Sequence, residues 1–267
     1  MQALIKWTGS KRLLAKVLCD YVPSSFNNYH EPFLGSGSMM YAISPQTAFL
    51  SDKLPELISL WHIIQHSPED LITSYIKNWE LLQHDKSYYY EVRKRFNLYR
   101  SPLDFFFLLR TCVNGLVRFN NKQEFNVALH HKRFGIHPNR LIPIIKDWSN
   151  KIQDYSFECC DYQSTIDNIH ANDFVYLDPP YCHSTGIYQG NIDYERLMIY
   201  LEQLHRKKAK YLLSFDGTKG DVDFTNIFKI PKELYKRHVL LNNHVCGFKK
   251  LSSKGNEPIR ESVYMNF

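Results

Sequence analysis

The sequence lacks the patterns that build disulfide frameworks and structural zinc sites. Its 267 residues include six cysteines, but no C-x-x-C pair occurs, and the adjacent Cys159 and Cys160 are poorly placed to bridge each other. The 12 histidines are scattered along the chain. We therefore predict reduced thiols, a cytosolic compartment and no metal site.

Long apolar runs are also missing. The longest apolar stretch, around residues 105–109, is far shorter than the roughly 20 residues that a membrane-spanning helix needs. Lys6, Lys11 and Arg12 interrupt the N-terminal apolar residues, so no signal peptide is visible. We expect a globular cytoplasmic protein with no membrane partner.

The third glycine of the dinucleotide-binding fingerprint is absent as well, which argues against an NAD-dependent oxidoreductase. A short strand is predicted up to Phe33, followed by the turn Leu34-Gly35-Ser36-Gly37-Ser38 and then a helix. A second apolar strand, 47–50, ends at Ser51-Asp52. This order is typical of a mononucleotide-binding unit. Asp52 stands where an acid binds ribose hydroxyls, although it could also cap the next helix.

The strongest single motif is Asp178-Pro179-Pro180-Tyr181, which directly follows the apolar strand 173–177. The lone pair of an aryl amine is delocalised into its ring, so the amine is a poor nucleophile. If the Asp178 carboxylate and the Pro179 carbonyl both accept its N–H bonds, the lone pair turns toward a methyl donor. Pro180 stiffens the backbone, and Tyr181 can stack on an extruded base for about 1–3 kcal/mol. The alternative is a proline-rich turn after a buried strand.

Positive charge is concentrated in one stretch. Residues 86–133 hold ten basic and three acidic side chains, a net +7, while the whole chain carries +6, which leaves −1 for the remainder. Asparagines and aromatic residues are interleaved with these charges, as on a nucleic-acid-binding face. A solvated helix surface is the alternative interpretation. The stretch lies in a predicted insert, 56–150, which divides a catalytic domain formed by 1–55 and 151–267.

The predicted fold class is α/β: a Rossmann-like sheet with helices on both faces and a mostly helical insert that carries a β-hairpin. The insert helices are expected to break near Pro68 and Pro102, with an extended hairpin over 114–130. Further helices are predicted over 11–22, 138–152 and 193–207, and further strands over 155–159, 174–177, 210–215, 237–241 and 262–266.

Two other motifs are weaker when taken alone. In Lys6-Trp7-Thr8-Gly9-Ser10-Lys11-Arg12, Lys11 or a backbone amide could hold a carboxylate and Trp7 could wall a pocket. In 114–120 and 124–127, asparagine and arginine side chains could pair with base edges in the major groove.

Taken in order, the four motifs resemble the DNA adenine methyltransferase (Dam) family, the α class of amino-methyltransferases, from Lys6 to about Tyr181. The resemblance implies S-adenosylmethionine as cofactor and site-specific methylation of adenine N6 in double-stranded DNA after base flipping. It also implies a nucleoid-associated location and, as a functional partner, a cognate restriction endonuclease. The residues implied to bind the cofactor are Trp7, Lys11, Phe33, Gly35, Gly37, Asp52, Asp161, Tyr162 and Asp178. The residues implied to recognise DNA are Asn114, Leu116, Arg118, Asn120 and Asn126, with Arg118 reading a guanine.

The chain departs from the family pattern in two places. Members that read GATC continue as E-F-N-V-P-F-G, whereas here Val127 is followed by Ala128, Leu129 and His130, so GATC is only a candidate site. Thr8 and Ser10 stand where alanine and glycine are common. The same pocket could also serve RNA or a protein glutamine amide. A non-catalytic DNA-binding module would need no cofactor turn.

Overall fold

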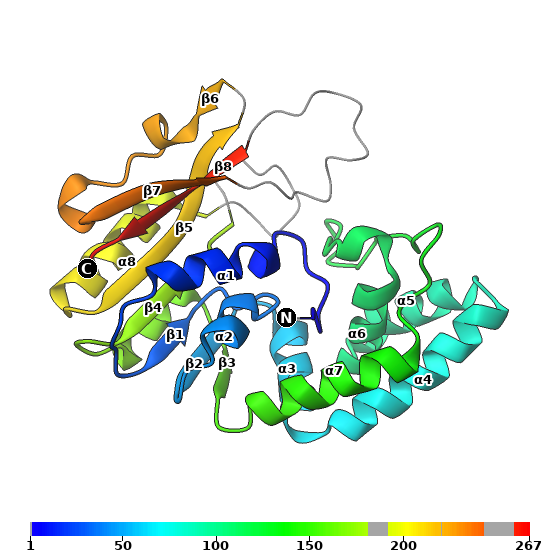
Figure 1. The fold of residues 1–267 in the computed structure, drawn as a ribbon. Coiled ribbons are helices and arrows are strands. Elements are labelled where there is room, and N and C mark those ends of the chain that lie inside the picture. Colours follow the sequence, from blue (N-terminus) through cyan, green and yellow to red (C-terminus); the bar gives the residue numbers. More distant parts are fainter. Residues whose placement is uncertain (1, 181–191, 220, 243–258) are drawn as a thin grey trace.

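The computed structural model describes residues 2–180, 192–219, 221–242 and 259–267. Within these ranges the centre of the molecule is an eight-stranded sheet in the order β3-β2-β1-β4-β5-β8-β7, with β6 paired to β5 (Figure 1). Strands β1 to β5 are parallel, and β8 runs antiparallel to both β5 and β7. The strands are β1 Tyr29–Glu31, β2 Ala48–Asp52, β3 Ser156–Cys159, β4 Phe174–Leu177, β5 Lys210–Lys219, β6 Val222–Asp223, β7 Arg237–Asn242 and β8 Ile259–Met265.

Helices cover both faces of this sheet. The side chains of β4 alternate between two core clusters: Phe174 and Tyr176 face the first, and Val175 and Leu177 face the second. Helices α1, α2 and α3 (Pro55–His66) contribute to the first cluster and α8 to the second. The predicted α/β class is thus confirmed. The bounds of the flanking helices are α1 Ala15–Leu18, α2 Ser38–Ile43 and α8 Tyr194–Arg206.

Five helices lie between β2 and β3 and form the insert: α3 Pro55–His66, α4 Pro68–His84, α5 Tyr88–Tyr99, α6 Pro102–Thr111 and α7 Pro138–Lys151. Four of the five begin at a proline, a residue whose fixed φ and missing N–H suit the first helical position. The predicted breaks near Pro68 and Pro102 are therefore confirmed. A further break, at residues 85–87, has no proline; there the Asp85 carboxylate accepts the Ser87 backbone N–H at 2.8 Å.

The prediction of one continuous helix over 11–22 is wrong. The segment consists of a 3-10 turn, the four-residue α1 and a second 3-10 turn. Leu14 and Leu18 are buried, whereas Leu13 and Val17 are 48% and 42% exposed, so only part of the expected apolar face has a partner. The 3-10 turns of the described chain are η1 Lys11–Leu13, η2 Cys19–Tyr21, η3 Val113–Gly115, η4 Tyr162–Asn168, η5 Phe224–Asn226 and η6 Lys232–Leu234.

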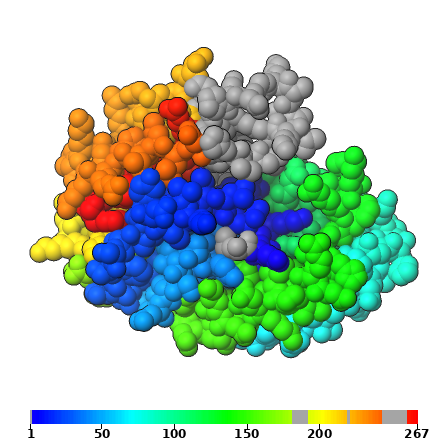
Figure 2. Space-filling view, in the orientation of Figure 1, coloured from blue at the N-terminus to red at the C-terminus, as the bar shows by residue number. Residues whose placement is uncertain are grey.

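One core cluster runs from the sheet into the insert without interruption. Trp61 of α3 is fully buried and stacks on Phe157 of β3, with ring centroids 5.7 Å apart, and its ring also lies 5.6 Å from that of Trp148 in α7. The N-terminal segment, dark blue in Figure 2, lies between the sheet and the insert. The sheet and the insert are therefore joined by a shared hydrophobic core as well as by the covalent chain.

Neither a disulfide nor a three-ligand metal cluster is present in the described ranges. Cys19, Cys112, Cys159 and Cys160 are free thiols. The prediction that zinc-binding spacings are missing is wrong at one place, because His62 and His66 form an H-x-x-x-H spacing on α3, with ring centroids 6.1 Å apart. Among the described residues no third His, Cys, Asp or Glu joins them. No helix in the described ranges is long and apolar enough to cross a membrane.

A buried carboxyl group joins β1 to α2. Glu31 is 2% exposed, and its Oε2 accepts hydrogen bonds from the Tyr29 hydroxyl at 2.7 Å and the Met40 backbone N–H at 2.9 Å. Burial raises the pKa of Glu31 from 4.5 to about 8, because those two hydrogen bonds offset only part of the lost hydration.

This raised pKa gives the stability of the fold a defined pH dependence. Between about pH 4.5 and 8 the folded chain keeps a proton that the unfolded chain has released, so the free energy of unfolding falls as the pH rises through that window. In Glu31→Gln the amide oxygen accepts the same two hydrogen bonds without titrating. We expect urea unfolding at pH 5, 6.5 and 8 to give a smaller decline for this variant than for the wild type. Parallel declines would contradict the assignment.

Candidate active site

The candidate site lies at the carboxyl edge of the parallel strands. β1 and β4 are neighbours, with Tyr29 opposite Phe174 and His30 opposite Val175. The segments that follow them, the glycine turn at 34–37 and residues 178–180, therefore emerge at the same edge of the sheet, where α/β proteins bind ligands. Pro179 is buried and Pro180 is half-buried. Tyr181 lies outside the described residues.

Asp178 is held by a buried cation. The Lys11 ammonium lies 2.6 Å from Asp178 Oδ1 and 3.2 Å from Glu261 Oε1, and the Ser214 hydroxyl donates to the same Glu261 oxygen. The Lys11 side chain is 8% exposed and that of Asp178 19%. Burial raises the pKa of Asp178, and the Lys11 ammonium opposes this by favouring the carboxylate. Because Lys11 contacts Asp178 through Oδ1 and the side chain keeps some exposure, the carboxylate remains partly accessible at the carboxyl edge of the sheet.

Glu261 and Ser214 were not predicted as site residues. They come from β8 and β5, which are antiparallel neighbours, and Ser214 lies opposite Val263 in the register. The only local signal in the sequence is an acid between Arg260 and Ser262, in a segment that carries no recognisable motif. That signal does not say which cation the acid meets.

The glycine turn is shaped by two tryptophans. Gly35 and Gly37 adopt φ of +47° and +64°, a region that side chains rarely enter. A Cβ on Gly35 would lie 3.0 Å from Trp7 Nε1, and a Cβ on Gly37 would lie 3.0 Å from the Trp61 ring. Trp61 Nε1 also donates to the Gly35 carbonyl at 3.3 Å. The structure thus brings Trp7 against the turn, as a pocket wall would require.

Asp52 supports the same turn. Its Oδ2 accepts the Gly35 N–H and its Oδ1 the Leu54 N–H, each at 3.1 Å. The second bond goes to Leu54, the residue before α3, and no side chain caps that helix, so the capping role considered for Asp52 is wrong. Burial raises the pKa of Asp52, and the two amide donors oppose the rise. Each carboxylate oxygen has a second lone pair, so ribose hydroxyls can still bind there.

Three hydroxyl groups fasten the N-terminal segment to the turn. The Ser10 hydroxyl lies 2.8 Å from that of Ser36 and 3.0 Å from that of Ser38, and these two are 2.9 Å apart. No sequence motif indicated this cluster, because Ser10 is distant from the other two in the chain. It places Lys11, the next residue, over the carboxyl edge.

The rings of Phe33 and Tyr162 meet with centroids 5.0 Å apart. Tyr162 is 6% exposed, and its buried hydroxyl has no hydrogen-bond partner among the described residues. Asp161 caps the 3-10 turn that follows, accepting the Gln163 N–H at 3.0 Å, and pairs with Arg196 at 3.2 Å. All the predicted cofactor residues therefore lie along the ends of β1 to β4 or on the N-terminal segment.

The predicted recognition residues lie on a separate hairpin. An isolated antiparallel bridge joins Phe119 to Phe125, and Arg118 Nε donates to Asn126 Oδ1 at 2.8 Å. Asn120 builds the tip, since its Oδ1 accepts the backbone N–H groups of Lys122 and Glu124, each at 2.9 Å. Arg118 is exposed and Leu116 packs against the core.

Asn114 lies at the root of this hairpin. It is exposed and adopts φ of +55°, a left-handed conformation that asparagine tolerates better than most residues. Its neighbour Gly115 packs against Lys6, because a Cβ there would lie 2.5 Å from Lys6 Cβ. The N-terminal segment therefore links the hairpin root to the glycine turn.

Comparison with known proteins gives consistent matches. The family described as D12 class N6 adenine-specific DNA methyltransferase matches residues 7–241. The DNA adenine methylase of Haemophilus influenzae is 30% identical over 260 residues, covering 89% of this chain and 87% of the relative. The type II methyltransferase M.MjaIII of Methanocaldococcus jannaschii is 27% identical over 277 residues, with 90% and 93% covered. M1.LlaDCHI of Lactococcus lactis, also named a type II methyltransferase, is 29% identical over 190 residues, with 68% and 66% covered.

The family match runs through the glycine turn, the helical insert, the hairpin and the Asp-Pro-Pro-Tyr edge. The predicted family and enzyme class are thereby confirmed. With the sheet order and the arrangement of Lys11, Asp178 and the glycine turn, the chain belongs to the D12 class of N6 adenine-specific DNA methyltransferases.

Proposed function

We propose that the chain transfers the methyl group of S-adenosylmethionine to the N6 of an adenine flipped out of duplex DNA, at the edge formed by the glycine turn and Asp178. The observation that carries this proposal is the Lys11–Asp178 contact of 2.6 Å beside a turn that Ser10 fastens through Ser36. The contact brings the proposed acceptor of the amine and the proposed cofactor loop to one place.

The residues present fit the cofactor. The positive φ of Gly35 and Gly37 lets the backbone approach a ligand closely, Trp7 supplies a wall, and Asp52 retains lone pairs for ribose hydroxyls. The buried hydroxyl of Tyr162, which has no hydrogen-bond partner in the part of the chain that the structure describes, offers a polar contact at the adenine end, beside Phe33. When bound, the cofactor's sulfonium supplies an electrophilic methyl group. Asp161 and Lys11 complete the proposed binding set.

Asp178 and Pro179 orient the target amine. Lys11 contacts Oδ1 of Asp178, so we assign Oδ2 and the Pro179 carbonyl to the two N6–H bonds. Holding both hydrogens turns the nitrogen lone pair out of conjugation with the purine ring, which is positioning and electrostatics rather than covalent catalysis. Pro180 keeps that carbonyl fixed, and Tyr181 is proposed to stack on the base.

The insert, 56–150, is proposed to act as the target-recognition domain. It carries the stretch with net +7, which suits the phosphate backbone of DNA, and it presents Arg118, Asn126 and Asn114 at its hairpin. Extruding a base costs a few kcal/mol of lost stacking, which binding of the adenine at the carboxyl edge must recover. A single-stranded RNA would need neither the hairpin nor this extrusion.

The biological setting follows from the relatives' names. Some of them are called type II methyltransferases, so we propose a cognate restriction endonuclease as functional partner and a nucleoid-associated, cytoplasmic location. GATC is the first sequence to test, with the Ala128-Leu129-His130 run as the reason to include related sites. Radiolabelled cofactor offered with duplex DNA, RNA and protein tests the substrate class directly. Label in RNA or protein alone would contradict the proposal.

Replacing Asp178 separates chemistry from binding. We expect Asp178→Ala to lower the rate of methyl transfer by at least about 10²–10³-fold, because one of two acceptors for the amine is lost. Duplex affinity should change by no more than about threefold. The variant should still fold, since Lys11 keeps Glu261 as a partner. Single-turnover formation of N6-methyladenine and a gel-shift titration measure the two quantities.

Asp178→Asn is the matched control for that substitution. With its single oxygen in the place of Oδ2, the amide accepts one N6–H bond without the charge and gives up the contact with Lys11, so its rate should fall between those of the wild type and Asp178→Ala. Wild-type turnover in Asp178→Ala would remove the proposed role.

Arg118 is the proposed guanine reader. Arg118→Ala should lose about 1–3 kcal/mol of discrimination, roughly 5- to 150-fold, at one base pair of the site. Methylation of a randomised duplex library, read by sequencing, measures the profile. Lys122→Ala, at the exposed hairpin tip, is the control and should weaken binding without altering sequence preference. An unchanged profile in Arg118→Ala would exclude Arg118 as a base reader.

A further inference from the structure

The first turn of helix α8 is tied to the 3-10 turn η4, which follows β3. Arg196, in that first turn, donates from Nε and Nη2 to Gln163 Oε1 at 2.9 and 2.5 Å. The Gln163 side-chain amide donates back to the Arg196 carbonyl at 3.3 Å. Each of the two residues therefore both donates to and accepts from the other, which fixes the direction of the guanidinium group.

The same guanidinium group reaches the carboxylate of Asp161. Arg196 Nη2 lies 3.2 Å from Asp161 Oδ1, and that oxygen also accepts the Gln163 backbone N–H at 3.0 Å. Among the described residues, Asp161 Oδ2 takes part in no hydrogen bond. The guanidinium carbon also lies 5.9 Å from the centre of the Tyr162 ring. The protein thus engages one oxygen of Asp161 and leaves the other to a ligand.

Asp161 stands at the carboxyl edge, beside the residue proposed to hold the cofactor ribose. The preceding residue, Cys160, donates its backbone N–H to the Asp52 carbonyl at 3.2 Å. The following residue, Tyr162, packs against Phe33, with ring centroids 5.0 Å apart. The carboxylate of Asp161 therefore belongs to the part of the edge that lies beyond Asp52, where the adenine ring of the proposed cofactor would lie.

A second and buried contact anchors η4 independently of Arg196. Tyr200 of α8 is fully buried, and its hydroxyl lies 2.7 Å from that of Thr165, which donates to the Tyr162 carbonyl at 2.6 Å. The side chains of Arg196 and Asp161 are, by contrast, 47% and 48% exposed. Loss of the guanidinium group should therefore leave the backbone of η4 in place and act on the carboxylate.

We propose that Arg196 is a positioning residue that sets how tightly and how selectively the chain binds the adenine ring of S-adenosylmethionine, an inference that rests on the proposed function. An ionised carboxylate only accepts hydrogen bonds, so Asp161 can recognise adenine through its exocyclic amine. A hypoxanthine ring carries an oxygen there and offers no such donor. Because Arg196 engages Oδ1 and holds the carboxylate in one orientation, Oδ2 is the acceptor for that amine.

The test measures binding of S-adenosylhomocysteine, the demethylated cofactor, to the full chain by calorimetry without DNA. We expect Arg196→Gln to weaken this binding about three- to fivefold, the effect of an ion pair that solvent partly screens. S-inosylhomocysteine carries hypoxanthine in place of adenine and should bind the wild type less tightly. Its affinity for Arg196→Gln should stay within about twofold of the wild-type value, because the contact that Arg196 supports is missing from the start.

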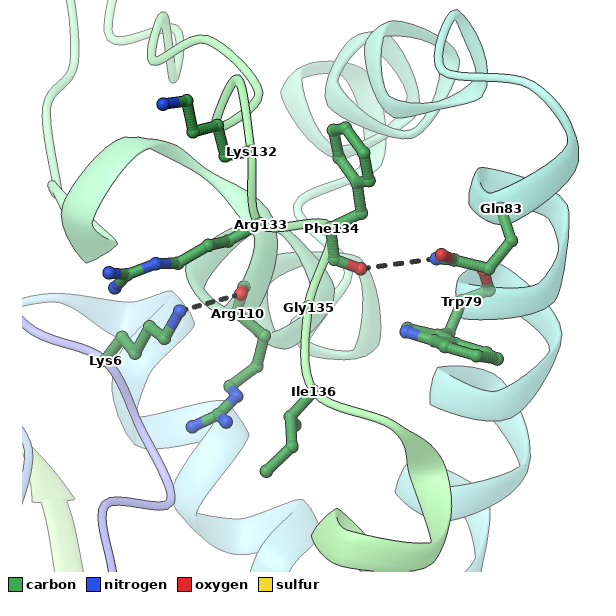
Figure 3. Close-up of a pocket in the computed structure, with 9 residues that line it drawn as sticks. All are labelled: Lys6, Trp79, Gln83, Arg110, Lys132, Arg133, Phe134, Gly135 and Ile136. Carbon is green, nitrogen blue, oxygen red and sulfur yellow. Dashed lines mark hydrogen bonds between the residues drawn. The ribbon is translucent and has the colours of Figure 1, made fainter.

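Three variants serve as controls. Arg196→Lys keeps the charge but loses the fork of donors, so its affinity for S-adenosylhomocysteine should lie between those of the wild type and Arg196→Gln. Arg206→Gln removes a 71% exposed cation at the other end of α8. Arg133→Gln removes a cation that lines the cavity of about 440 Å³ in the insert (Figure 3). Neither of these two substitutions should change the affinity for S-adenosylhomocysteine.

A double substitution tests whether Arg196 acts through Asp161. Adding Arg196→Gln to Asp161→Asn should cause no further loss of S-adenosylhomocysteine binding, since the two residues are coupled. Full additivity would contradict that route. Equal weakening of both analogues in Arg196→Gln would show a general structural role and overturn the proposal, as would unchanged affinity for both.

The wild type distinguishes failure of this inference from failure of the proposed function. Tight binding of S-adenosylhomocysteine by the wild type, without a selective loss in Arg196→Gln, would contradict the role of Arg196 alone. A wild-type chain that binds neither analogue and forms no N6-methyladenine would contradict the proposed function.

Discussion

The ammonium group of Lys11 lies between two carboxylates, and the arrangement of the carboxyl edge depends on it. It joins a residue near the start of the chain to Asp178 after β4 and to Glu261 in β8. Charges removed from water at this depth are tolerated only when they are paired and hydrogen-bonded. Losing the cation would leave two buried acids facing each other, with the Ser214 hydroxyl still donating to Glu261. The same contact orients the acceptor that the chemistry needs.

How much the sequence predicts depends on how local each feature is. The glycine turn, Asp52 and the Asp-Pro-Pro run are read from neighbouring residues, because a strand end and a tight turn carry their signals within a few positions. The four prolines that begin α3, α4, α6 and α7 mark helix starts in the same local way. Family, fold class and enzyme class were therefore predictable. The roles of the individual site residues remain predictions.

Features assembled from distant segments gave no such signal. Glu261 meets Lys11 only because β8 inserts antiparallel between β5 and β7, and no spacing rule encodes that neighbour. The contact of Ser10 with Ser36 and Ser38 depends likewise on where the N-terminal segment crosses the edge. The continuous helix expected over 11–22 was wrong for a related reason: its apolar spacing is helical, but the tertiary structure buries only a narrow part of it.

The shared core around Trp61 bears on how such enzymes could be recombined. This side chain stacks on a sheet residue, bonds the carbonyl of Gly35 and touches Trp148 within the insert. A fragment limited to 56–150 would expose these buried contacts to solvent. A chimaera that exchanges 56–150 between relatives would have to keep the contacts of Trp61 with both the sheet and the insert. A graft limited to the hairpin beyond Gly115 leaves the Trp61 contacts intact, although it must match the buried Val117, Phe125 and Val127. Exchange of sequence preference between relatives is therefore physically easiest at the hairpin, with the helices left in place.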